Sequence, residues 1–440
     1  MAATIDETHD PYRRSWVPDA DGHADFPLQN LPLGIFSPPG GGARAGIAIG
    51  THILDLGTAL AAGLLEGAAA TAAQAAAGDT LNALLALGAE PRRALRRRLF
   101  ALLSAEASSA AIARLRPGLH AAASCKMQLP VRIGDYTDFF AGIHHAYNGG
   151  VRNQRNPPLA PNYRHVPVAY HGRASSVVAS GAPLWRPRGQ VMTAGSVSPV
   201  FLPSAKLDFE LELGIWIGPG NSRGTAIPIG SAADQMAGLC LLNDWSARDI
   251  QAWEMAPLGP FLSKNFTTTV SPWIITPEAL APYATAQQPR GLGEPQPLPY
   301  LNDATDQACG AYNIELEALI CSAAMRQQGH APQRITHSNA RHLYWTVAQM
   351  VAHHSCGGCD LQAGDLFGSG TVSAPERNGW GSLAELTNDG REPLTLPTGE
   401  SRGFLEDGDE LILRAHAARD GYATIGFGEC IGLLLPSQTE

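Results

Sequence analysis

Hydrophobic and acidic residues alternate along residues 207–216, which read Leu-Asp-Phe-Glu-Leu-Glu-Leu-Gly-Ile-Trp. A period of two predicts a β-strand with Asp208, Glu210 and Glu212 on one face and apolar side chains on the other. Acidic residues are depleted in strands, and carboxylates this close repel one another unless a cation lies between them. The pattern therefore leaves two interpretations, a hydrated strand face or part of a cation site.

A second polar segment favours the cation site. Residues 243–254 read Asn-Asp-Trp-Ser-Ala-Arg-Asp-Ile-Gln-Ala-Trp-Glu, and this pattern predicts a helix over 246–255 that Asp244 caps. Side chains at spacings of four, three and four lie on one face of a helix. The residues on that face are Asp244, Arg248, Gln251 and Met255. A third carboxylate, a guanidinium group and an amide then point in the same direction.

The rest of the chain divides into two regions of different pattern. Residues 34–56 predict two short strands around a Pro-Pro-Gly-Gly-Gly turn, and helical periodicity follows from residue 60 to about 116, where Pro-Gly ends it. After residue 127, short runs of Val, Ile, Phe, Trp and Tyr are separated by Gly and Pro, which predicts mostly β-structure. Helices interrupt this region at about 137–147, 246–254 and 337–352, and residues 281–299 predict a Pro-rich surface loop. We therefore predict a mainly β, α+β chain with domains over 1–120 and 121–440.

Composition excludes several classes of partner. The 440 residues carry 31 Lys and Arg against 40 Asp and Glu, a net charge of −9, so neither a nucleic acid nor an anionic membrane is expected as a partner. The basic run 92–98 is interrupted by leucines at helical spacing, which predicts the solvent-facing side of an amphipathic helix. Neither the acidic first 30 residues nor the Ala-rich stretch 58–77 resembles a signal peptide or a membrane span. Seven scattered cysteines favour a reducing compartment, so we expect a cytoplasmic protein.

Three motif matches do not lead to a function. Cys356-Gly-Gly-Cys359 lacks a second pair of ligands at zinc-site spacing and predicts a turn. The segment from Gly220 to Gly224 matches a hydrolase nucleophile elbow, but Ile227-Pro228-Ile229 follows where the elbow requires a helix. The glycines after residue 40 resemble a dinucleotide fingerprint in the wrong context, so no nicotinamide cofactor is expected.

Two further segments carry candidate chemistry. If residues 137–147 are helical, Asp138 and His145 lie two turns apart on one face and join an acid to a base. Lys264 lies in an otherwise apolar turn, where a buried ammonium group needs an acidic or metal-bound partner.

Several of these segments together resemble the fumarylacetoacetase family, and the resemblance covers essentially the whole chain. It implies an N-terminal SH3-like small barrel with helices and a C-terminal mixed β-sandwich roll. It also implies a homodimer. The segments that carry the resemblance are Asp135-Tyr-Thr-Asp-Phe139, His145-Ala146, Tyr170-His-Gly-Arg-Ala-Ser-Ser176, residues 207–212, residues 243–251, Pro257-Leu-Gly-Pro-Phe-Leu262 with Lys264, and Ser369-Gly-Thr371.

The resemblance also assigns residues to roles. It implies a Ca²⁺ or Mg²⁺ ion held by Asp138, Glu210, Glu212 and Asp244, and all-oxygen ligation is what these hard cations take. It implies a structural Mg²⁺ near Asp244, Lys264 and Thr268. Its catalytic group is His145 as the base, Glu385 as the carboxylate that orients it, and Arg248, Gln251 and Lys264. Its substrate contacts are Phe140, Arg152, Tyr170, Gln251, Met255 and Thr371.

The activity implied is hydrolysis of the carbon–carbon bond of 4-fumarylacetoacetate to fumarate and acetoacetate, the last step of tyrosine and phenylalanine breakdown. Two positions depart from the family pattern, because Phe140 and Met255 stand where it has tyrosines, and either Arg152 or Arg155 matches its carboxylate-binding arginine. These departures keep open a second interpretation, a relative that hydrolyses or decarboxylates another β-diketone or β-keto acid. A third, a calcium-stabilised scaffold protein, is disfavoured because metal binding alone needs neither His145 nor Glu385.

Overall fold

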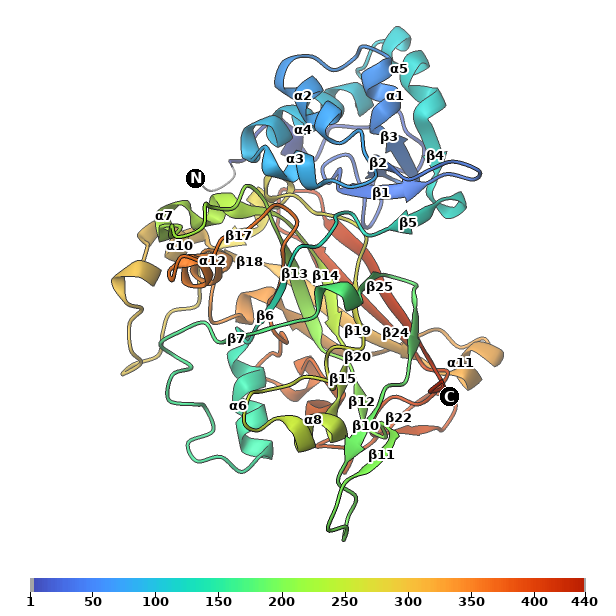
Figure 1. Cartoon of the computed structure of the whole chain (residues 1–440). Helices are drawn as coiled ribbons and strands as arrows, with labels where there is room; N and C mark the ends of the chain where they lie inside the picture. The colour runs from blue at the N-terminus through green and yellow to red at the C-terminus, as the bar shows by residue number, and fades with distance from the viewer. Residues whose placement is uncertain (1–3, 439–440) are drawn as a thin grey trace.

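The computed structural model describes residues 4–438, so the extreme ends of the two predicted domains lie outside it. Two large sheets stand side by side beneath a smaller N-terminal domain (Figure 1). The chain is thus the mixed α+β, sheet-rich protein that the sequence pattern predicts. No helix within the described residues has the length and apolar character needed to span a lipid bilayer.

The N-terminal domain contains a five-stranded antiparallel sheet covered by helices. Residues 34–56 form three strands and not the two predicted, because Gly50, at φ +54°, allows a second tight turn between β2 and β3. The SH3-like character and the boundary near residue 120 stay predictions. In sheet order the strands are β4 (Leu119–Ala121), β3 (His52–Asp55), β2 (Arg44–Ile49), β1 (Leu33–Ser37) and β5 (Lys126–Gln128). The helices are α1 (Leu56–Ala61), α2 (Gly67–Ala75), α3 (Asn82–Ala86), α4 (Ala89–Leu103) and α5 (Ser109–Leu115).

The seven-stranded sheet is buried on both faces. Along β13, Leu211, Leu213 and Ile215 pack into the core shared with the second sheet, whereas Trp216 packs against the N-terminal domain. Every residue of β13 is buried, including Glu212, so the acidic face predicted for this segment is not hydrated. In sheet order the strands are β7 (Ala169–His171), β6 (Tyr136–Phe139), β21 (Leu366–Gly368), β13 (Leu211–Ile217), β14 (Met236–Asp244), β16 (Thr268–Val270) and β8 (Val177–Ala179).

The second sheet has five strands, and four short strand pairs and eight helices complete the C-terminal region among the described residues. The strands in sheet order are β20 (Gln333–Asn339), β19 (Ile314–Cys321), β24 (Glu410–Ala417), β25 (Ile425–Leu435) and β9 (Pro183–Trp185). The short pairs are β10 (Arg188–Val191) with β11 (Val200–Pro203), β12 (Leu207–Asp208) with β15 (Ser246–Ala247), β17 (Ala284–Thr285) with β18 (Ala311–Tyr312), and β22 (Leu394–Thr395) with β23 (Ser401–Arg402). The helices are α6 (Ile143–Arg152), α7 (Ile229–Ala232), α8 (Arg248–Glu254), α9 (Pro277–Leu280), α10 (Ala304–Cys309), α11 (Ala323–Gln327), α12 (Val347–Ser355) and α13 (Leu383–Leu386).

Three predicted helices have different bounds. The segment predicted over 137–147 is strand β6 followed by α6, so Asp138 and His145 do not share a helix. The segment 337–352 starts as the end of β20, and α12 begins only at Val347. Asp244 is the last residue of β14 and not a helix cap, because the apolar run before it continues in register beside β13 and Ala247 precedes the helix.

The prediction that the basic run on α4 faces only solvent is wrong. Its leucines are buried as predicted, but so are Arg92 and Arg96. Arg92 makes two hydrogen bonds to Glu278, at 2.9 and 3.0 Å, and Arg96 donates to the backbone oxygens of Gln29 and Asn30. The arginines therefore join α4 to segments on either side of it, and the Arg92–Glu278 pair crosses between the two regions of the chain.

We predict that Arg92→Met lowers the free energy of unfolding by about 3 kcal/mol, because it leaves the Glu278 carboxylate buried without its partner. Burial alone raises the pKa of Glu278, but Arg92 outweighs it and holds the pKa below the usual 4.5. The pair therefore stabilises the fold above pH 4.5, and its contribution is lost as pH falls through the folded-state pKa. Urea unfolding at pH 7 and pH 4 measures both effects. Arg97→Met, which removes an exposed guanidinium group, is the control and changes stability by less than about 1 kcal/mol; an equal loss in both variants contradicts the prediction.

Candidate active site

Four buried carboxylates meet where adjacent strands of the seven-stranded sheet lie side by side. Asp138 on β6 is opposite Gly368 on β21, and β21 in turn pairs with β13, which carries Glu212. Asp244 ends β14 on the other side of β13. Glu210 lies at the break between β12 and β13, where its backbone N–H donates to the side chain of Asn243. One oxygen from each of the four carboxylates lies within 4.8 Å of the others.

The electrostatics of this cluster favour a cation. Burial and the neighbouring carboxylates raise the pKa of Asp138 and of Glu212 well above the ordinary values. Asp138 Oδ1 and Glu212 Oε1 are buried without a hydrogen-bond partner among the described residues. Unpaired buried acceptors of this kind are costly unless a cation or a proton satisfies them. The cluster therefore has the charge, the donor atoms and the free acceptors that a divalent cation requires.

Gly368 is required for the close approach of the carboxylates. A Cβ atom at this position would lie 2.3 Å from Asp138 Oδ1 and 3.0 Å from Glu212 Oε2. Both distances are too short, so any larger residue would displace one carboxylate from the cluster. The glycine thus keeps the centre of the cluster open between β6 and β13.

Two cationic side chains lie at one side of the cluster. Lys264 Nζ lies 2.7 Å from Glu210 Oε2 and 2.6 Å from Asp244 Oδ2, and Arg248 Nη1 lies 2.8 Å from Glu210 Oε1. Burial raises the pKa of Glu210, but Lys264, Arg248 and His145 outweigh it and lower the pKa. Lys264 has the acidic partners that its apolar turn requires. Neither cation pairs with Asp138 or Glu212, so the far side of the cluster stays uncompensated within the described residues.

Asp244 receives two further hydrogen bonds. Tyr170 donates its hydroxyl to Asp244 Oδ2 at 2.8 Å, and Thr268 donates to Oδ1 at 3.2 Å. Thr268 and Lys264 therefore both contact Asp244, and the second cation that the family resemblance implies beside these three residues stays a prediction. Tyr170, predicted as a substrate contact, is already bonded to the carboxylate cluster.

The predicted base and its orienting carboxylate are in contact, although 240 positions separate them. His145 Nδ1, on α6, lies 2.6 Å from Glu385 Oε2, on α13. Burial raises the pKa of Glu385, but His145 and the hydrogen bonds from His145, Asn148 and Ser382 lower it to about 2. Glu385 thus stays ionised, and its contact with Nδ1 leaves Nε2 of His145 free to exchange a proton. The roles of the two residues stay a prediction.

The residues predicted to contact substrate differ in burial and in their present partners. Phe140 packs edge-on against the His145 ring at 5.5 Å, and Thr371 Oγ1 is buried without a partner among the described residues. Gln251 accepts a hydrogen bond from Arg248, whereas Met255 is 43% exposed at the end of α8. Arg152 pairs with Asp389 at 3.1 Å, so a substrate carboxylate would have to compete with that residue.

Sequence reasoning missed the groups that hold Glu385. Ser373 and Ser382 donate their hydroxyls to the carboxylate at 2.8 to 3.0 Å, and Asn148 donates to Oε1 at 2.8 Å. Two local signals were present. Ser382 and Glu385 have the Ser-x-x-Glu spacing of a helix start, and Asn148 follows His145 by three positions on one helix face.

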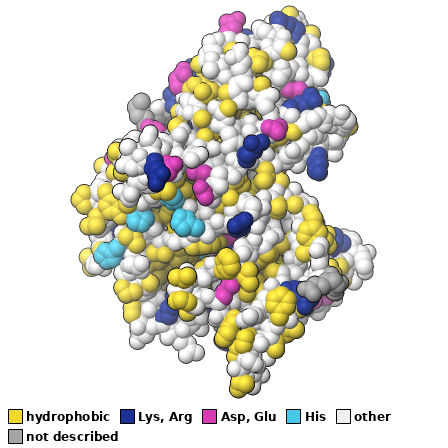
Figure 2. All heavy atoms as spheres, in the orientation of Figure 1, with side chains coloured by type: hydrophobic (Ala, Val, Ile, Leu, Met, Phe, Trp, Pro, Cys, Tyr) yellow, Lys and Arg dark blue, Asp and Glu magenta, His cyan; other side chains and the backbone are white. Residues whose placement is uncertain are grey.

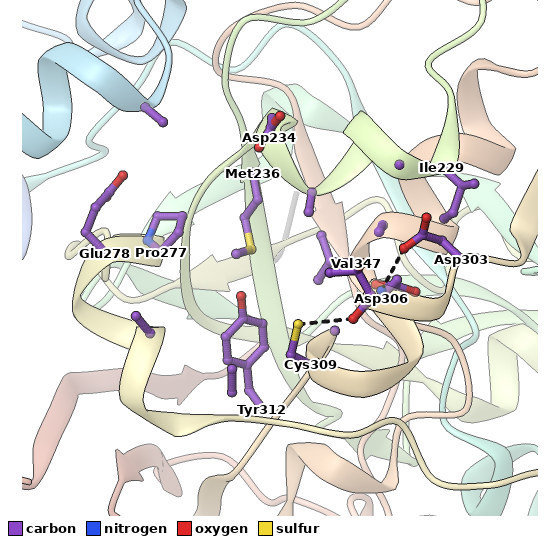
Figure 3. Close-up of a pocket in the computed structure, with 18 of the residues that line it drawn as sticks. Ile229, Asp234, Met236, Pro277, Glu278, Asp303, Asp306, Cys309, Tyr312 and Val347 are labelled. Atoms are coloured by element: carbon purple, nitrogen blue, oxygen red, sulfur yellow. Dashed lines mark hydrogen bonds between the residues drawn. The ribbon is translucent and has the colours of Figure 1, made fainter. Parts of the chain in front are cut away.

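A cavity of ≈ 210 Å³ lies away from the carboxylate cluster. Figure 3 shows Met236, Glu278, Asp306 and Tyr312 around it, and Arg92 contributes to the wall on the side of the N-terminal domain. No member of the cluster or of the His145–Glu385 pair lines the cavity. The candidate active site is therefore the cluster with its flanking pair, and this cavity is separate from it.

Family models and known proteins match nearly the whole chain. The model described as Fumarylacetoacetase N-terminal matches residues 29–130, and the model described as Fumarylacetoacetate (FAA) hydrolase C-terminal matches residues 137–432. A fumarylacetoacetase of Arabidopsis thaliana is 44% identical over 428 residues, covering 95% of this chain and 98% of that protein. One of Homo sapiens is 43% identical over 434 residues, covering 96% and 99%. A solved fumarylacetoacetate hydrolase from Exiguobacterium antarcticum, 14% identical, has a similar fold with a TM-score of 0.50, covering 93% of this chain and 100% of that one.

We predict that Glu212→Gln weakens the binding of a divalent cation at least about tenfold, because affinity follows the number of charged ligands. The same change should raise the melting temperature of the cation-free protein. The folded-state pKa of Glu212 lies above its unfolded value of 4.5, so its charge opposes folding above that pH. Calorimetric titration and thermal unfolding measure the two effects. Glu315→Gln, at an exposed residue of β19, is the control. A Glu212→Gln protein with normal affinity and a lower melting temperature would show that the cluster holds no cation.

Proposed function

The chain belongs to the fumarylacetoacetase family, and from this premise we propose that it hydrolyses the carbon–carbon bond of 4-fumarylacetoacetate to fumarate and acetoacetate. The observation that carries the proposal is the His145–Glu385 contact beside the buried carboxylates. A scaffold that only bound a cation would not need a histidine held by an ionised glutamate. His145 is close enough to the cluster to lower the pKa of Glu210, together with Lys264 and Arg248 and against the effect of burial.

We propose that Asp138, Glu210, Glu212 and Asp244 hold a Ca²⁺ or Mg²⁺ ion, and that a structural Mg²⁺ lies by Asp244, Lys264 and Thr268. Only carboxylate oxygens are offered at the first of these positions, which suits both ions. When bound, a divalent cation polarises the two oxygens of a 1,3-diketone and stabilises the negative charge that develops on them.

The chain's own residues supply the proton transfers and the remaining charge stabilisation. His145 Nε2 removes a proton from the water that attacks the carbonyl carbon of the fumaroyl group, while Glu385 orients the ring through Nδ1. The bond from that carbon to the neighbouring CH₂ then breaks to give fumarate, and the departing carbon takes the proton from His145 to give acetoacetate. Arg248 Nη2 and Thr371 Oγ1 are buried without partners among the described residues, so both are free to donate to substrate oxygens.

The two departures from the family pattern lie at the edge of the site. Phe140 is 36% exposed and touches the His145 ring, and Met255 is 43% exposed. Apolar groups here cannot donate the hydrogen bonds that tyrosines would. They favour, as a second candidate, a related β-diketone with a less polar end as a substrate of the same site.

We also propose that two copies of the chain associate through an apolar surface beside the site. This surface, the α8 surface, comprises exposed hydrophobic side chains of α8, of the loop after it and of β11. Its most exposed members are Leu258, Phe261 and Phe201, whose side chains are 97%, 67% and 57% exposed. Figure 2 shows hydrophobic side chains gathered at this lower end of the molecule. The residues concerned are Leu258, Phe261, Phe201, Trp253, Met255, Leu262, Val200 and Leu202. Exposed hydrophobic side chains gathered on one protein surface mark an interface, and two-fold dimers are the commonest assembly.

We propose a cytoplasmic location because the cysteines form no disulfides. All seven are free, and two of them, Cys356 and Cys359, are exposed. Exposed thiols in proximity along the chain persist best in a reducing compartment.

We predict that His145→Ala lowers kcat for fumarylacetoacetate at least about a hundredfold, as expected for loss of a general base, while cation binding stays intact. Proton NMR follows the equimolar appearance of fumarate and acetoacetate. His144→Ala, at the adjacent, half-buried histidine, is the control and retains most of the activity. Near-normal turnover of His145→Ala together with loss of turnover in His144→Ala would show that the base is His144 and not His145.

The dimer predicts a separate result. Phe201→Asp combined with Phe261→Asp places charges in the middle of the α8 surface and should convert the protein to a monomer in analytical ultracentrifugation. Leu292→Asp introduces the same charge at a fully exposed leucine outside the surface and should leave the dimer unchanged. A dimer that persists in the double variant shows that the copies associate elsewhere.

A further inference from the structure

Asp208 is fully buried but does not belong to the carboxylate cluster. It was expected to share the acidic strand face with Glu210 and Glu212, yet β12 ends at Asp208 and β13 begins at Leu211. The break turns the Asp208 carboxylate away, and the four residues whose oxygens converge do not include it. A buried carboxylate must be paired, so its partners show what it does.

The partners of Asp208 come from two parts of the site. Oδ2 accepts from Arg248 Nε at 2.8 Å and from the backbone N–H of Ala384 at 3.1 Å. Oδ1 accepts from the backbone N–H of Leu383 at 2.6 Å and of Phe209 at 2.9 Å. One carboxylate therefore binds both the guanidinium group beside the cluster and the first turn of α13.

Each of these partners carries a group that the proposed reaction uses. Arg248 Nη1 contacts Glu210 and Gln251, and its Nη2 is buried without a partner among the described residues. The first turn of α13 carries Glu385, which contacts His145. Because a short helix of four residues has little stability of its own, the bonds from Asp208 to its N–H groups fix its first turn, while Ser373, Ser382 and Asn148 hold the Glu385 carboxylate.

We propose that Asp208 is a positioning residue that sets Arg248 and the Glu385-bearing turn in register with each other, an inference that rests on the proposed function. The charged form and the four accepted hydrogen bonds are both needed. In Asp208→Asn, one oxygen is replaced by an amide that donates, and it would face other donors on Arg248 and Ala384. Replacing the one oxygen that accepts from both Arg248 and Ala384 therefore loosens two sides of the site at once.

A double-mutant cycle tests the proposal. Asp208→Asn should lower kcat at least about tenfold with a smaller change in KM, but less than about threefold when Glu385→Gln has already removed the carboxylate that it positions. Asp249→Asn is the matched control, since this neighbouring carboxylate accepts from Ser204 and Ala205 and contacts neither Arg248's guanidinium group nor α13. The control should keep kcat within about twofold.

A second readout needs no substrate. The ¹⁵N resonances of the His145 ring, assigned by their loss in His145→Ala, should shift in Asp208→Asn and stay in place in Asp249→Asn. The proposal is overturned if Asp208→Asn lowers kcat by the same factor with Glu385 and with Glu385→Gln. It is also overturned if the His145 resonances do not move in Asp208→Asn. If Asp208→Asn does not fold, Asp208→Glu gives the same comparison, and failure of both to fold makes Asp208 a structural residue only. Absence of fumarate and acetoacetate with the unchanged chain contradicts the proposed function instead, and the resonances still decide the role of Asp208.

Discussion

Mutual repulsion among four buried carboxylates is the constraint on which the rest of this structure depends. All four side chains are buried, so the charges on Asp138, Glu210, Glu212 and Asp244 are neutralised by protons, by Lys264 and Arg248, or by a bound cation. The two basic side chains reach Glu210 and Asp244 and not the other two. A divalent cation on the uncompensated side, by Asp138 and Glu212, would complete the neutralisation, and it would lie beside the base that the proposed chemistry requires.

The fold supplies the rigid frame that this constraint needs. Strands β6, β13 and β14 carry Asp138, Glu212 and Asp244, Glu210 lies just before β13, and Gly368 on β21 leaves room between the side chains. Both faces of the sheet are packed, one against the second sheet and one against the N-terminal domain. The Arg92–Glu278 pair joins that domain to the C-terminal region, and the buried Arg96 holds α4 to the backbone of Gln29 and Asn30 within it. The carboxylates therefore cannot relax apart in response to their repulsion.

Local patterns predicted the parts of this site but not their arrangement. The alternation over residues 207–216 identified Glu210 and Glu212, and the fold class followed from short β-type runs. Asp138 and His145 were placed on one helix because their spacing of seven fits a helix, whereas Gly142 separates a strand from the helix α6. The polar residues after Asp244 predict that it caps a helix, but pairing with β13 extends strand β14 to include it.

What the sequence could not show depends on contacts between distant segments. His145 meets Glu385 across 240 positions, and Arg92 meets Glu278 across 186. A charged residue is predicted as solvent-exposed until its partner is known, which is why the pattern places Arg92 and Arg96 on a solvent-facing surface although both are buried. Motif resemblance recovered Glu385, because it compares the chain with whole proteins and not with local periodicities.

The central claim is that a divalent cation neutralises the buried cluster and makes the site active. The most direct measurement strips the protein of metal with a chelator, then follows the loss of fumarylacetoacetate absorbance as Ca²⁺ or Mg²⁺ is added back, with bound metal counted by atomic emission. We expect no turnover in the stripped protein and activity that rises in proportion to the bound ion. Full turnover by a protein that holds no metal would contradict it.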